Sequence, residues 1–322
     1  MSFTGSQKII IHSYFNQTMP IDATIVRTII LEQFGVLPTE LEQIEMGVMT
    51  FKYKVKVNQC WYILRIYPPA NTTRTNLEFA IMHQLFTMNC KVPEPVLYNH
   101  TRGPHWLLYK FIDGQPLSLL RPAPDAATIS IIAGQILDTM QHFTKAPVEG
   151  FGFLLTGEQP FTSWKDFLVD SVNRGRLYLS SIKEFDQCTI DRLVAFATQQ
   201  IEHLHLEKPC LVWSDFSQGN IIIHNNQLAG FVDFEGCVSG DPVMALGYLF
   251  AIEAHSAFFE SMWLQFKKQY AITYERIVFY TIIRLFRLSK YYHVAFPTGI
   301  NRDPLMVYFK GISKAVAYVK SL

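Results

Sequence analysis

The segment from residue 210 to residue 242 constrains the fold of this chain most strongly. It reads CLVWSDFSQGNIIIHNNQLAGFVDFEGCVSGDP and interrupts a series of helical patterns. Its short apolar runs are separated by Asp, Asn and Gly, a pattern typical of short strands and tight loops. Asp215, Asn220 and Asp233 lie at the ends of those runs, where loops can bring carboxylates and an amide to one point. Such oxygen ligands suit a divalent metal and a chain of phosphates.

The part of the chain before this segment has the pattern of a small sheet with one helix. Residues 49–57 alternate apolar and polar positions and predict a strand. Residues 60–67 are expected to be its hairpin partner, with a turn at Asn58-Gln59. A helix is expected over 75–88, followed by a strand in VPEPVLYNH and another over 105–114. Ahead of the sheet, a helix capped by Asp22 is expected to end at Gly35, and residues 1–22 to form an irregular extension.

From Ala126 onward the pattern is mainly helical. Helical spacing of apolar residues covers 125–143, 163–182 with Ser163 as N-cap, and 191–206, and helices resume after residue 242. His203 and His205 are interpreted as helix-surface residues. The sequence therefore predicts an α+β protein with a small antiparallel-sheet N-terminal lobe and a larger, mainly helical C-terminal lobe.

Composition narrows the function classes. The net charge is +1, which gives no electrostatic reason to expect nucleic acid as a partner. No apolar run reaches the length of a membrane span, so no membrane partner is expected. The five cysteines are scattered and form no CxxC pair, which argues against a disulfide framework or a zinc site. With no leader pattern at the N-terminus, a cytoplasmic location is expected; the oligomeric state stays open.

The polar residues of the segment 210–242 match the needs of phosphoryl transfer. That reaction needs a carboxylate for the attacking hydroxyl, oxygen ligands for Mg²⁺, and a cation on the phosphates. Protein kinases meet the first two needs with D-x-x-x-x-N and the Asp of D-F-G. Here Asp215 and Asn220 have the same spacing, and Asp233 begins the triplet Asp-Phe-Glu.

Together these residues resemble the signature of the aminoglycoside phosphotransferase / choline kinase superfamily. That signature runs H-G-D-x-x-x-x-N, then an apolar residue with D-[WF]-E, then G-D-P. The matching positions are Asp215, Asn220, Asp233, Glu235, Gly240, Asp241 and Pro242. The resemblance extends over roughly residues 35–250 and implies a protein-kinase-like bilobal fold. It implies a nucleotide-binding lobe over 1–112, a hinge near residue 112, and a catalytic and substrate-binding lobe over 113–322.

The resemblance also assigns roles to individual residues. Asp215 is implied as the catalytic carboxylate, with Asn220 and Asp233 as Mg²⁺ ligands. Arg65 is implied on the phosphates with Glu78 as its ion-pair partner, and Glu235 and Asp241 in supporting roles. The remaining nucleotide contacts are implied at the glycine turn and along the hinge strand, at Gly47, Leu108, Tyr109, Lys110 and Phe111. The implied cofactors are ATP and Mg²⁺, with GTP as an open alternative because hinge contacts are made by the backbone.

Four positions depart from the family pattern. Trp213, Ser214, Ser217 and Ala245 stand where the family usually has His, Gly, His and an acidic residue. An indole has only one donor, so Trp213 cannot replace the hydrogen bonds of a histidine. Either the catalytic loop is held by other contacts or activity is low. The expected function is transfer of the ATP γ-phosphate to a hydroxyl of a small acceptor, and the rivals are another acceptor class, a protein or fructosamine-type kinase, or a weak pseudokinase that serves as an interaction protein.

The sequence does not name the acceptor, but its charge distribution favours some classes of acceptor over others. After Pro242 the chain carries ten basic residues against four acidic ones. A site for a polycationic aminoglycoside would favour carboxylates, so the count favours a neutral, monocationic or anionic acceptor, such as a sugar, amino alcohol, nucleoside or macrolide-like compound. Arg284, Arg287 and Lys290 follow one another at three-residue steps on a helix. They either bind an acidic group of the substrate or cover the helix surface with their aliphatic stems.

Overall fold

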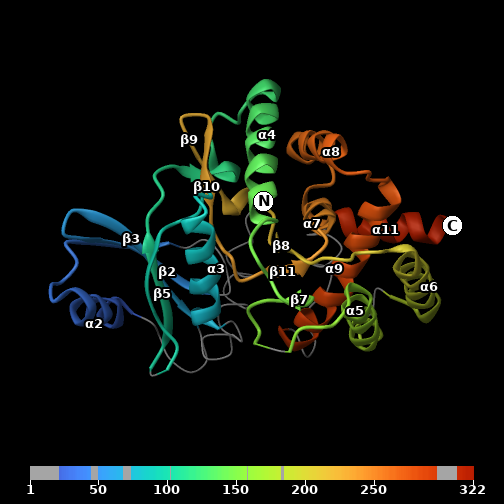
Figure 1. The fold of residues 1–322 in the computed structure, drawn as a ribbon, viewed down its shortest axis with the longest axis horizontal. Helices are drawn as coiled ribbons and strands as arrows, with labels where there is room; N and C mark the ends of the chain where they lie inside the picture. Colours follow the sequence, from blue (N-terminus) through green and yellow to red (C-terminus); the bar gives the residue numbers. More distant parts are fainter. Residues whose placement is uncertain are drawn as a thin grey trace. The chain divides into compact units, whose positions relative to one another are not determined.

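The chain forms two compact units. The computed structural model describes residues 22–44, 50–67, 74–101, 103–157, 159–182, 185–295 and 310–322. The first unit runs to Asp113 and takes in two later segments, Leu155–Gly157 and Gly230–Glu235, while the second unit contains the rest of the chain. The first unit is built on an antiparallel sheet and the second is mainly helical, which confirms the predicted α+β class (Figure 1). The predicted extension before Asp22 lies outside the described residues.

The sheet of the first unit has five antiparallel strands. They are β1 (Glu40–Ile44), β2 (Phe51–Val57), β3 (Cys60–Tyr67), β4 (Pro95–Asn99) and β5 (His105–Lys110), in the order β1-β2-β3-β5-β4. The predicted hairpin of β2 and β3 is confirmed. Asn58 and Gln59 connect its strands with positive φ angles of 48° and 66°, the backbone that a tight two-residue hairpin turn requires. Strand β1 was not predicted.

The two faces of this sheet have different neighbours. Helix α2 (Ala23–Phe34) packs its buried residues into a core with Leu64 and Ile66 of β3. Asp22 caps this helix and Gly35 ends it with φ of 69°, as predicted. Because side chains alternate along a strand, Arg65 and Tyr67 lie on the opposite face, where their contacts with helix α3 (Thr75–Thr87) are made.

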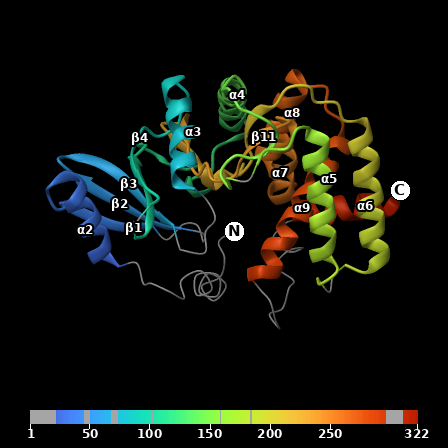
Figure 2. The same ribbon diagram turned by 60° about the horizontal axis from the view of Figure 1, so that its bottom comes forward.

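The second unit consists of helices with two small sheets. Its helices are α4 (Ala126–Phe143), α5 (Trp164–Leu179), α6 (Gln187–His203), α7 (Val243–Glu253), α8 (Ala257–Gln269), α9 (Tyr274–Ala295) and α11 (Lys310–Ser321). Figure 2 shows α5 beside both α6 and α9. The three predicted helices are confirmed, and Ser163 caps α5. Helix α6 begins earlier than expected and ends at His203, so His205 lies beyond it. Among the described residues, no helix is both long and apolar enough to cross a membrane.

The segment from residue 210 to residue 242 forms four short strands. β8 (Cys210–Trp213), β9 (Ile221–His224), β10 (Gln227–Phe231) and β11 (Cys237–Gly240) are joined by tight loops. Together with β6 (Gln115–Pro116) and β7 (Gly152–Phe153) they form the sheets β10-β9-β6 and β7-β11-β8. The short helix η1 (Leu117–Leu119) follows β6, and η2 (Gln218–Asn220) lies between β8 and β9.

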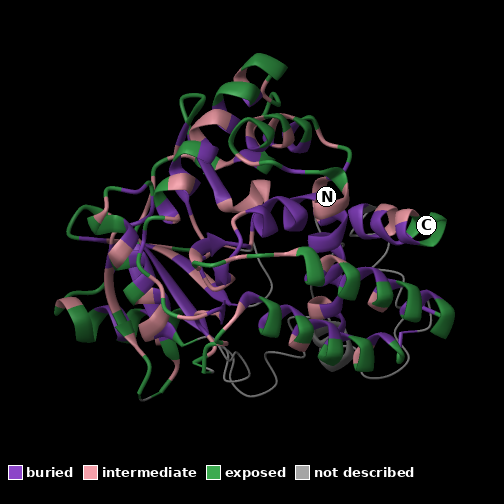
Figure 3. Cartoon of the chain, turned by 45° about the vertical axis from the view of Figure 1, so that its right-hand side comes forward, coloured by how far each residue is buried: buried purple, intermediate pink, exposed green. Residues whose placement is uncertain are grey.

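Helix α7 lies at the centre of the helical unit. Its residues from Val243 to Ala251 are all buried, as are residues 277–286 of its neighbour α9, whereas α5 and α6 each have buried and exposed positions (Figure 3). A helix that is apolar all round must be enclosed by other elements. Glycines allow the close packing: a Cβ at Gly247 would lie 2.4 Å from the Cβ of Tyr280 on α9.

Gly175 on α5 gives a direct test of this packing. A Cβ there would lie 2.4 Å from the Cβ and 2.5 Å from the carbonyl oxygen of Phe286 on α9. We expect Gly175→Ala to lower the free energy of unfolding by about 1–3 kcal/mol, because the helices must separate. Gly134 on α4 has no atom within 4 Å of its Cβ position, so Gly134→Ala should be neutral or stabilising by up to about 1 kcal/mol. Urea titration of both variants checks this, and equal effects would contradict it.

Candidate functional site

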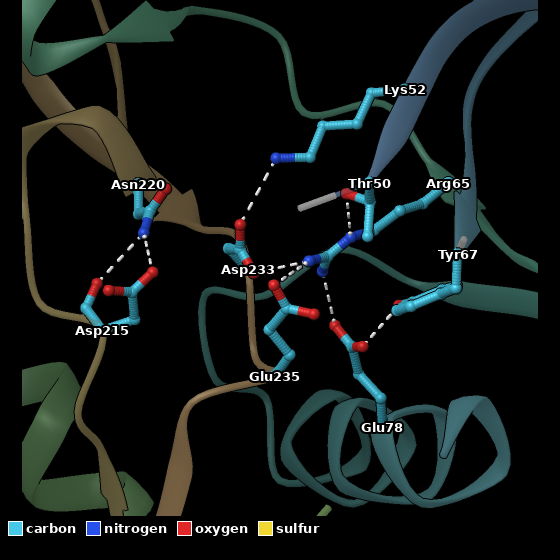
Figure 4. Close-up of polar contacts among 9 residues, drawn as sticks. All are labelled: Thr50, Lys52, Arg65, Tyr67, Glu78, Asp215, Asn220, Asp233 and Glu235. Atoms are coloured by element: carbon cyan, nitrogen blue, oxygen red, sulfur yellow. Dashed lines mark hydrogen bonds and ion pairs between the residues drawn. The ribbon is translucent and has the colours of Figure 1, made fainter. Parts of the chain in front are cut away.

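Arg65 is the centre of a buried ionic cluster in the first unit. Strand β3 lies between β2 and β5, and the Arg65 side chain is 1% exposed. Its Nε donates to the Thr50 hydroxyl at 3.0 Å, and its Nη1 donates to Glu78 at 2.8 Å. Nη2 lies 2.8 Å from Asp233 Oδ1 and 2.9 Å from Glu235 Oε1 (Figure 4). The predicted pair of Arg65 and Glu78 is therefore present, and the two residues of the Asp-Phe-Glu triplet join it.

Glu78 is fixed from both sides. It lies in the first turn of α3 and is 1% exposed. One carboxylate oxygen accepts from Arg65, and the other accepts from the Tyr67 hydroxyl. Burial raises the pKa of Glu78, and Arg65 opposes that rise. A carboxylate so deeply buried is stable in its charged form only while the guanidinium stays in place.

Asp233 and Glu235 have shifted pKa values of opposite sign. Burial by itself would raise the pKa of Asp233, but the charges of Arg65 and Lys52 outweigh burial and lower that pKa to about 2. Burial raises the pKa of Glu235 to about 7; Arg65 opposes the rise and the like charge of Asp233 adds to it. Asp233 also has a positive φ of 68°, a backbone strain typical of functional positions. Asp233 is thus the permanently ionised carboxylate of the pair.

Lys52 on β2 is a member of this cluster that the sequence did not reveal. It is the cross-strand partner of Arg65, so the two side chains share a face of the sheet. Its Nζ lies 3.3 Å from Asp233 Oδ2, and the side chain is 17% exposed. Both oxygens of Asp233 therefore bind a cationic group, Arg65 at one and Lys52 at the other. In the sequence Lys52 was only one of three alternating lysines in FKYKVKV, the pattern of a solvent-facing strand side.

Asp215 and Asn220 come together in the second unit, as their spacing predicted. Asp215 follows β8, and Asn220 ends the short helix η2. The Asn220 amide donates to the Asp215 carbonyl oxygen at 3.0 Å and to its carboxylate Oδ2 at 2.9 Å (Figure 4). The Asp215 side chain is 39% exposed, so it can reach a ligand. The amide nitrogen holds the carboxylate, which leaves the amide oxygen of Asn220 for a different partner.

The catalytic loop is held without a histidine. Trp213 is 0% exposed, and its ring lies 5.7 Å from that of Phe216, so it belongs to the core. Ser214 donates its hydroxyl to the carbonyl oxygen of Gly236 at 2.5 Å. This bond joins the loop to the chain that follows Glu235, and Asn220 closes the loop from its other end. Of the alternatives that the sequence left open at Trp213, the structure shows other contacts holding the loop.

Asp241 is a buried carboxylate that contacts both α7 and α9. It is 2% exposed and starts α7 by accepting from the backbone N–H of Val243 at 2.9 Å. Its other oxygen accepts from Arg276 and from the Tyr280 hydroxyl, both on α9. Both oxygens of this buried carboxylate are therefore engaged in hydrogen bonds within the second unit. Asp241 therefore ties α7 to α9 within the second unit.

The expected adenine contacts remain predictions. Leu108 is 1% exposed in the core beside α2, and β5 is paired on both sides, so main-chain groups of Leu108 and Tyr109 are used within the sheet. Lys110 forms an exposed ion pair with Glu94. Phe111, just after β5, lies with its ring 4.0 Å from the Lys54 ammonium. Gly47 lies outside the described residues.

Solved structures with the same fold define the class of protein. The fold matches an aminoglycoside phosphotransferase, a thermostable mutant of APH(4)-Ia in ternary complex with AMP-PNP and hygromycin B. The TM-score is 0.73 at 16% identity, over 93% of this chain and 97% of that one. It also matches spectinomycin phosphotransferase APH(9)-Ia in complex with ADP and spectinomycin, with a TM-score of 0.65 at 12% identity, over 94% and 100% of the two chains. The fold is that of the kinase-like small-molecule phosphotransferases.

A family comparison of the sequence gives the membership. Residues 40–280 match the model of the phosphotransferase enzyme family. The chain belongs to this family, and the predicted resemblance is confirmed. No curated protein gives a significant match to the sequence.

Proposed function

We propose that this protein is a small-molecule kinase that moves the γ-phosphate of ATP to a hydroxyl of a small acceptor. The observation that carries the proposal is the buried cluster in which one guanidinium, Arg65, binds Glu78, Asp233 and Glu235 together. Burying so many charges is costly, and an ordinary structural ion pair does not require it. Binding nucleotide phosphates, in contrast, requires a cation and an acidic metal ligand that are held in fixed positions. Family membership and the catalytic-loop pair Asp215 and Asn220 support the same reaction.

The nucleotide side of the reaction falls to the first unit. Arg65 is held in one orientation by four groups, and Lys52 adds a second cation on the same face. Both can donate to phosphate oxygens. Asp233 binds the cationic groups of Arg65 and Lys52 and is ionised, which supports its role as an acidic metal ligand. Asp233 and the amide oxygen of Asn220 would hold Mg²⁺. When bound, this ion would neutralise part of the charge on the phosphates.

The acceptor side falls to Asp215. Its carboxylate accepts the proton of the acceptor hydroxyl as the hydroxyl oxygen forms a bond to the γ-phosphorus. The bond from that phosphorus to the bridging β-phosphate oxygen breaks, and ADP leaves. The proton on Asp215 then passes to solvent. Asn220 fixes the carboxylate at 2.9 Å, so Asp215 contributes orientation as well as basicity.

Nucleotide binding and turnover test the proposal together. We expect ATP with Mg²⁺ to raise the melting temperature, and EDTA to remove most of that rise because the metal bridges carboxylate and phosphates. GTP in a parallel titration decides between the two nucleotides. ADP release should be stimulated by one class in a panel of aminoglycosides, macrolides, amino alcohols, sugars, nucleosides and hydroxy acids. Nucleotide binding without any turnover, or no nucleotide binding at all, would refute the kinase function and favour the pseudokinase alternative.

A further inference from the structure

Arg284 places a guanidinium beside the proposed catalytic carboxylate. It lies on α9, and its Nη2 is 3.7 Å from Asp215 Oδ1. That contact is an ion pair longer than a hydrogen bond. The Arg284 side chain is 11% exposed, and the Asp215 side chain is 39% exposed. An acceptor hydroxyl that reaches Asp215 therefore brings its neighbouring substituents next to Arg284.

The guanidinium is held in a fixed orientation. The ring of Tyr248 on α7 lies 4.5 Å from the guanidinium carbon of Arg284. One turn further along α9, Arg287 lies 3.6 Å above the ring of Phe153 and donates to the Ser171 hydroxyl at 3.0 Å. Stacking on aromatic faces keeps an arginine in one plane and reduces the entropy it loses on binding. An exposure of 11% and the stacking on Tyr248 do not fit an Arg284 that only covers the helix surface with its aliphatic stem.

A buried hydroxyl lies in the same region. The Tyr248 side chain is 4% exposed, and within the part of the chain that the structure describes its hydroxyl has no hydrogen-bond partner. A buried polar group without a partner is unusual in a native fold, and a bound ligand is one common reason for it. Tyr248 is the residue on which Arg284 stacks, so the hydroxyl belongs to the surroundings of that guanidinium.

The charge near Asp215 is unfavourable for a cationic acceptor. Arginine keeps its charge at every physiological pH, and an ammonium next to the reacting hydroxyl would be repelled by it. A carboxylate or phosphate next to the hydroxyl, in contrast, would form charge-assisted hydrogen bonds with the planar guanidinium.

We propose that the acceptor is an alcohol with an acidic group, a carboxylate or a phosphate, close to the hydroxyl that is phosphorylated, and that Arg284 binds this group. The inference rests on the proposed kinase function, since it assigns the substrate class of the same site. It sets this chain apart from proteins whose acceptors are aminoglycosides. Tyr248 acts through Arg284 and is a positioning residue.

Matched acceptor pairs test the inference on the full-length protein. Each pair shares a hydroxyl and differs in the acidic group: L-lactate against ethanol, D-glucuronate against D-glucose, and glycerol 3-phosphate against glycerol. Hygromycin B and spectinomycin form the cationic arm. ADP release and thermal shift are measured for the wild type, Arg284→Gln, Arg284→Lys and the control Arg174→Gln. Arg174 is an exposed arginine of α5 in an ion pair with Asp170, so the control removes the same charge from the surface.

For at least one pair we expect the acidic member to have a kcat/KM about tenfold or more above that of its partner. Arg284→Gln should raise the KM for that acid by about ten- to hundredfold, the size of a lost hydrogen bond to a charged group. The neutral partner should be unaffected. Arg284→Lys should retain part of the affinity because it keeps the charge but not the planar fork, and Arg174→Gln should behave as the wild type.

Other outcomes separate this inference from the kinase function itself. A cationic aminoglycoside as the preferred acceptor would overturn the inference and leave the kinase function standing. A loss of kcat in Arg284→Gln that is equal for acidic and neutral partners would reduce Arg284 to positioning Asp215, and would overturn it too. If no compound is turned over, the thermal shifts still decide: acids that stabilise the wild type but not Arg284→Gln support the inference, and no shift with any acid refutes it. The kinase function fails separately, when ATP with Mg²⁺ neither binds nor is consumed.

Discussion

Asp215→Asn should lower kcat by about 10²–10⁴-fold while the protein stays folded, the range that a positioned general base contributes. In the wild type, the Asn220 side chain donates to Asp215 Oδ2 at 2.9 Å. An amide at position 215 has the same shape as the carboxylate, so its oxygen can still accept this hydrogen bond. An amide cannot take a proton from the acceptor hydroxyl, however. The loss should therefore fall on kcat, and the melting-temperature rise with ATP and Mg²⁺ should persist because nucleotide binding involves other residues.

Asp125→Asn is the matched control for this variant. Asp125 caps α4 by accepting from the backbone N–H of Thr128 at 2.8 Å, and asparagine is an equally good N-cap. The same chemical change at an exposed position should leave both activity and stability unaltered. An Asp215→Asn variant that keeps wild-type kcat with the best acceptor would show that Asp215 is not the catalytic carboxylate. A fall in activity with a parallel loss of the nucleotide-induced shift would point to unfolding instead.

Local patterns made the architecture of the first unit largely predictable. The alternation of β2, the turn at Asn58 and Gln59, and the caps at Asp22 and Gly35 each act over a few residues, and all are present. Strand β1 escaped prediction because Glu40–Ile44 is an edge strand with no buried position, so it lacks an apolar alternation. The return of Gly230–Glu235 to this unit has no local signal.

The candidate site likewise contains residues whose positions a local sequence pattern predicts and residues whose positions it does not. Asp215 and Asn220 are five residues apart, and their pairing follows from one loop. Lys52 could not be distinguished from the other lysines of its strand, because its role depends on Asp233, 181 residues later. Arg65 was open to interpretation as a surface arginine of an edge strand; only the sheet order, with β3 between β2 and β5, shows that it is buried.

Asp241 shows where motif resemblance alone is insufficient. The triplet Gly-Asp-Pro marks the family but does not state what the carboxylate contacts. Its partners Arg276 and Tyr280 lie 35 and 39 residues further along the chain. They belong to the C-terminal region in which the sequence offered no motif. The structural role of Asp241 therefore became visible only with the packing of α9 against α7.

Arg65→Met should produce the largest loss of stability, about 3–5 kcal/mol, the cost of removing one partner from a buried ionic cluster. Methionine fills a similar volume, so the loss is electrostatic rather than a cavity effect. Glu78, Asp233 and Glu235 would be left close together with no guanidinium between them. Arg65→Lys should recover only part of the loss, because an ammonium cannot reproduce a fork that bonds Thr50 and three carboxylates. Chemical denaturation measures each effect.

The destabilisation of Arg65→Met should depend on pH. In the wild type the pKa of Asp233 is lowered, so its contribution to stability is present above its ordinary value of 3.8 and is lost only as the pH falls toward about 2. Burial already raises the pKa of Glu78, and that of Glu235 to about 7, in the wild type, where Arg65 opposes the rise. In the variant this opposition is lost, so the pKa values of the three carboxylates rise. Their destabilising effect is then relieved as the pH falls through those raised values toward the ordinary ones. We expect the stability gap between variant and wild type to be smaller at about pH 5.5 than at about pH 8.

Lys52→Gln is the matched control, since Lys52 binds the other oxygen of the same Asp233. Its ammonium lies 3.3 Å from the carboxylate and is more exposed than the guanidinium, so water can replace it more easily. Because Lys52 is 17% exposed and Arg65 only 1%, Lys52→Gln should weaken ATP binding with a smaller effect on unfolding, whereas Arg65→Met should strongly impair both. If the two variants lost the same stability, the cluster would owe its stability to the net charge around Asp233. A large loss confined to Arg65→Met would instead identify the buried guanidinium as the group that allows three carboxylates to stay together in the first unit.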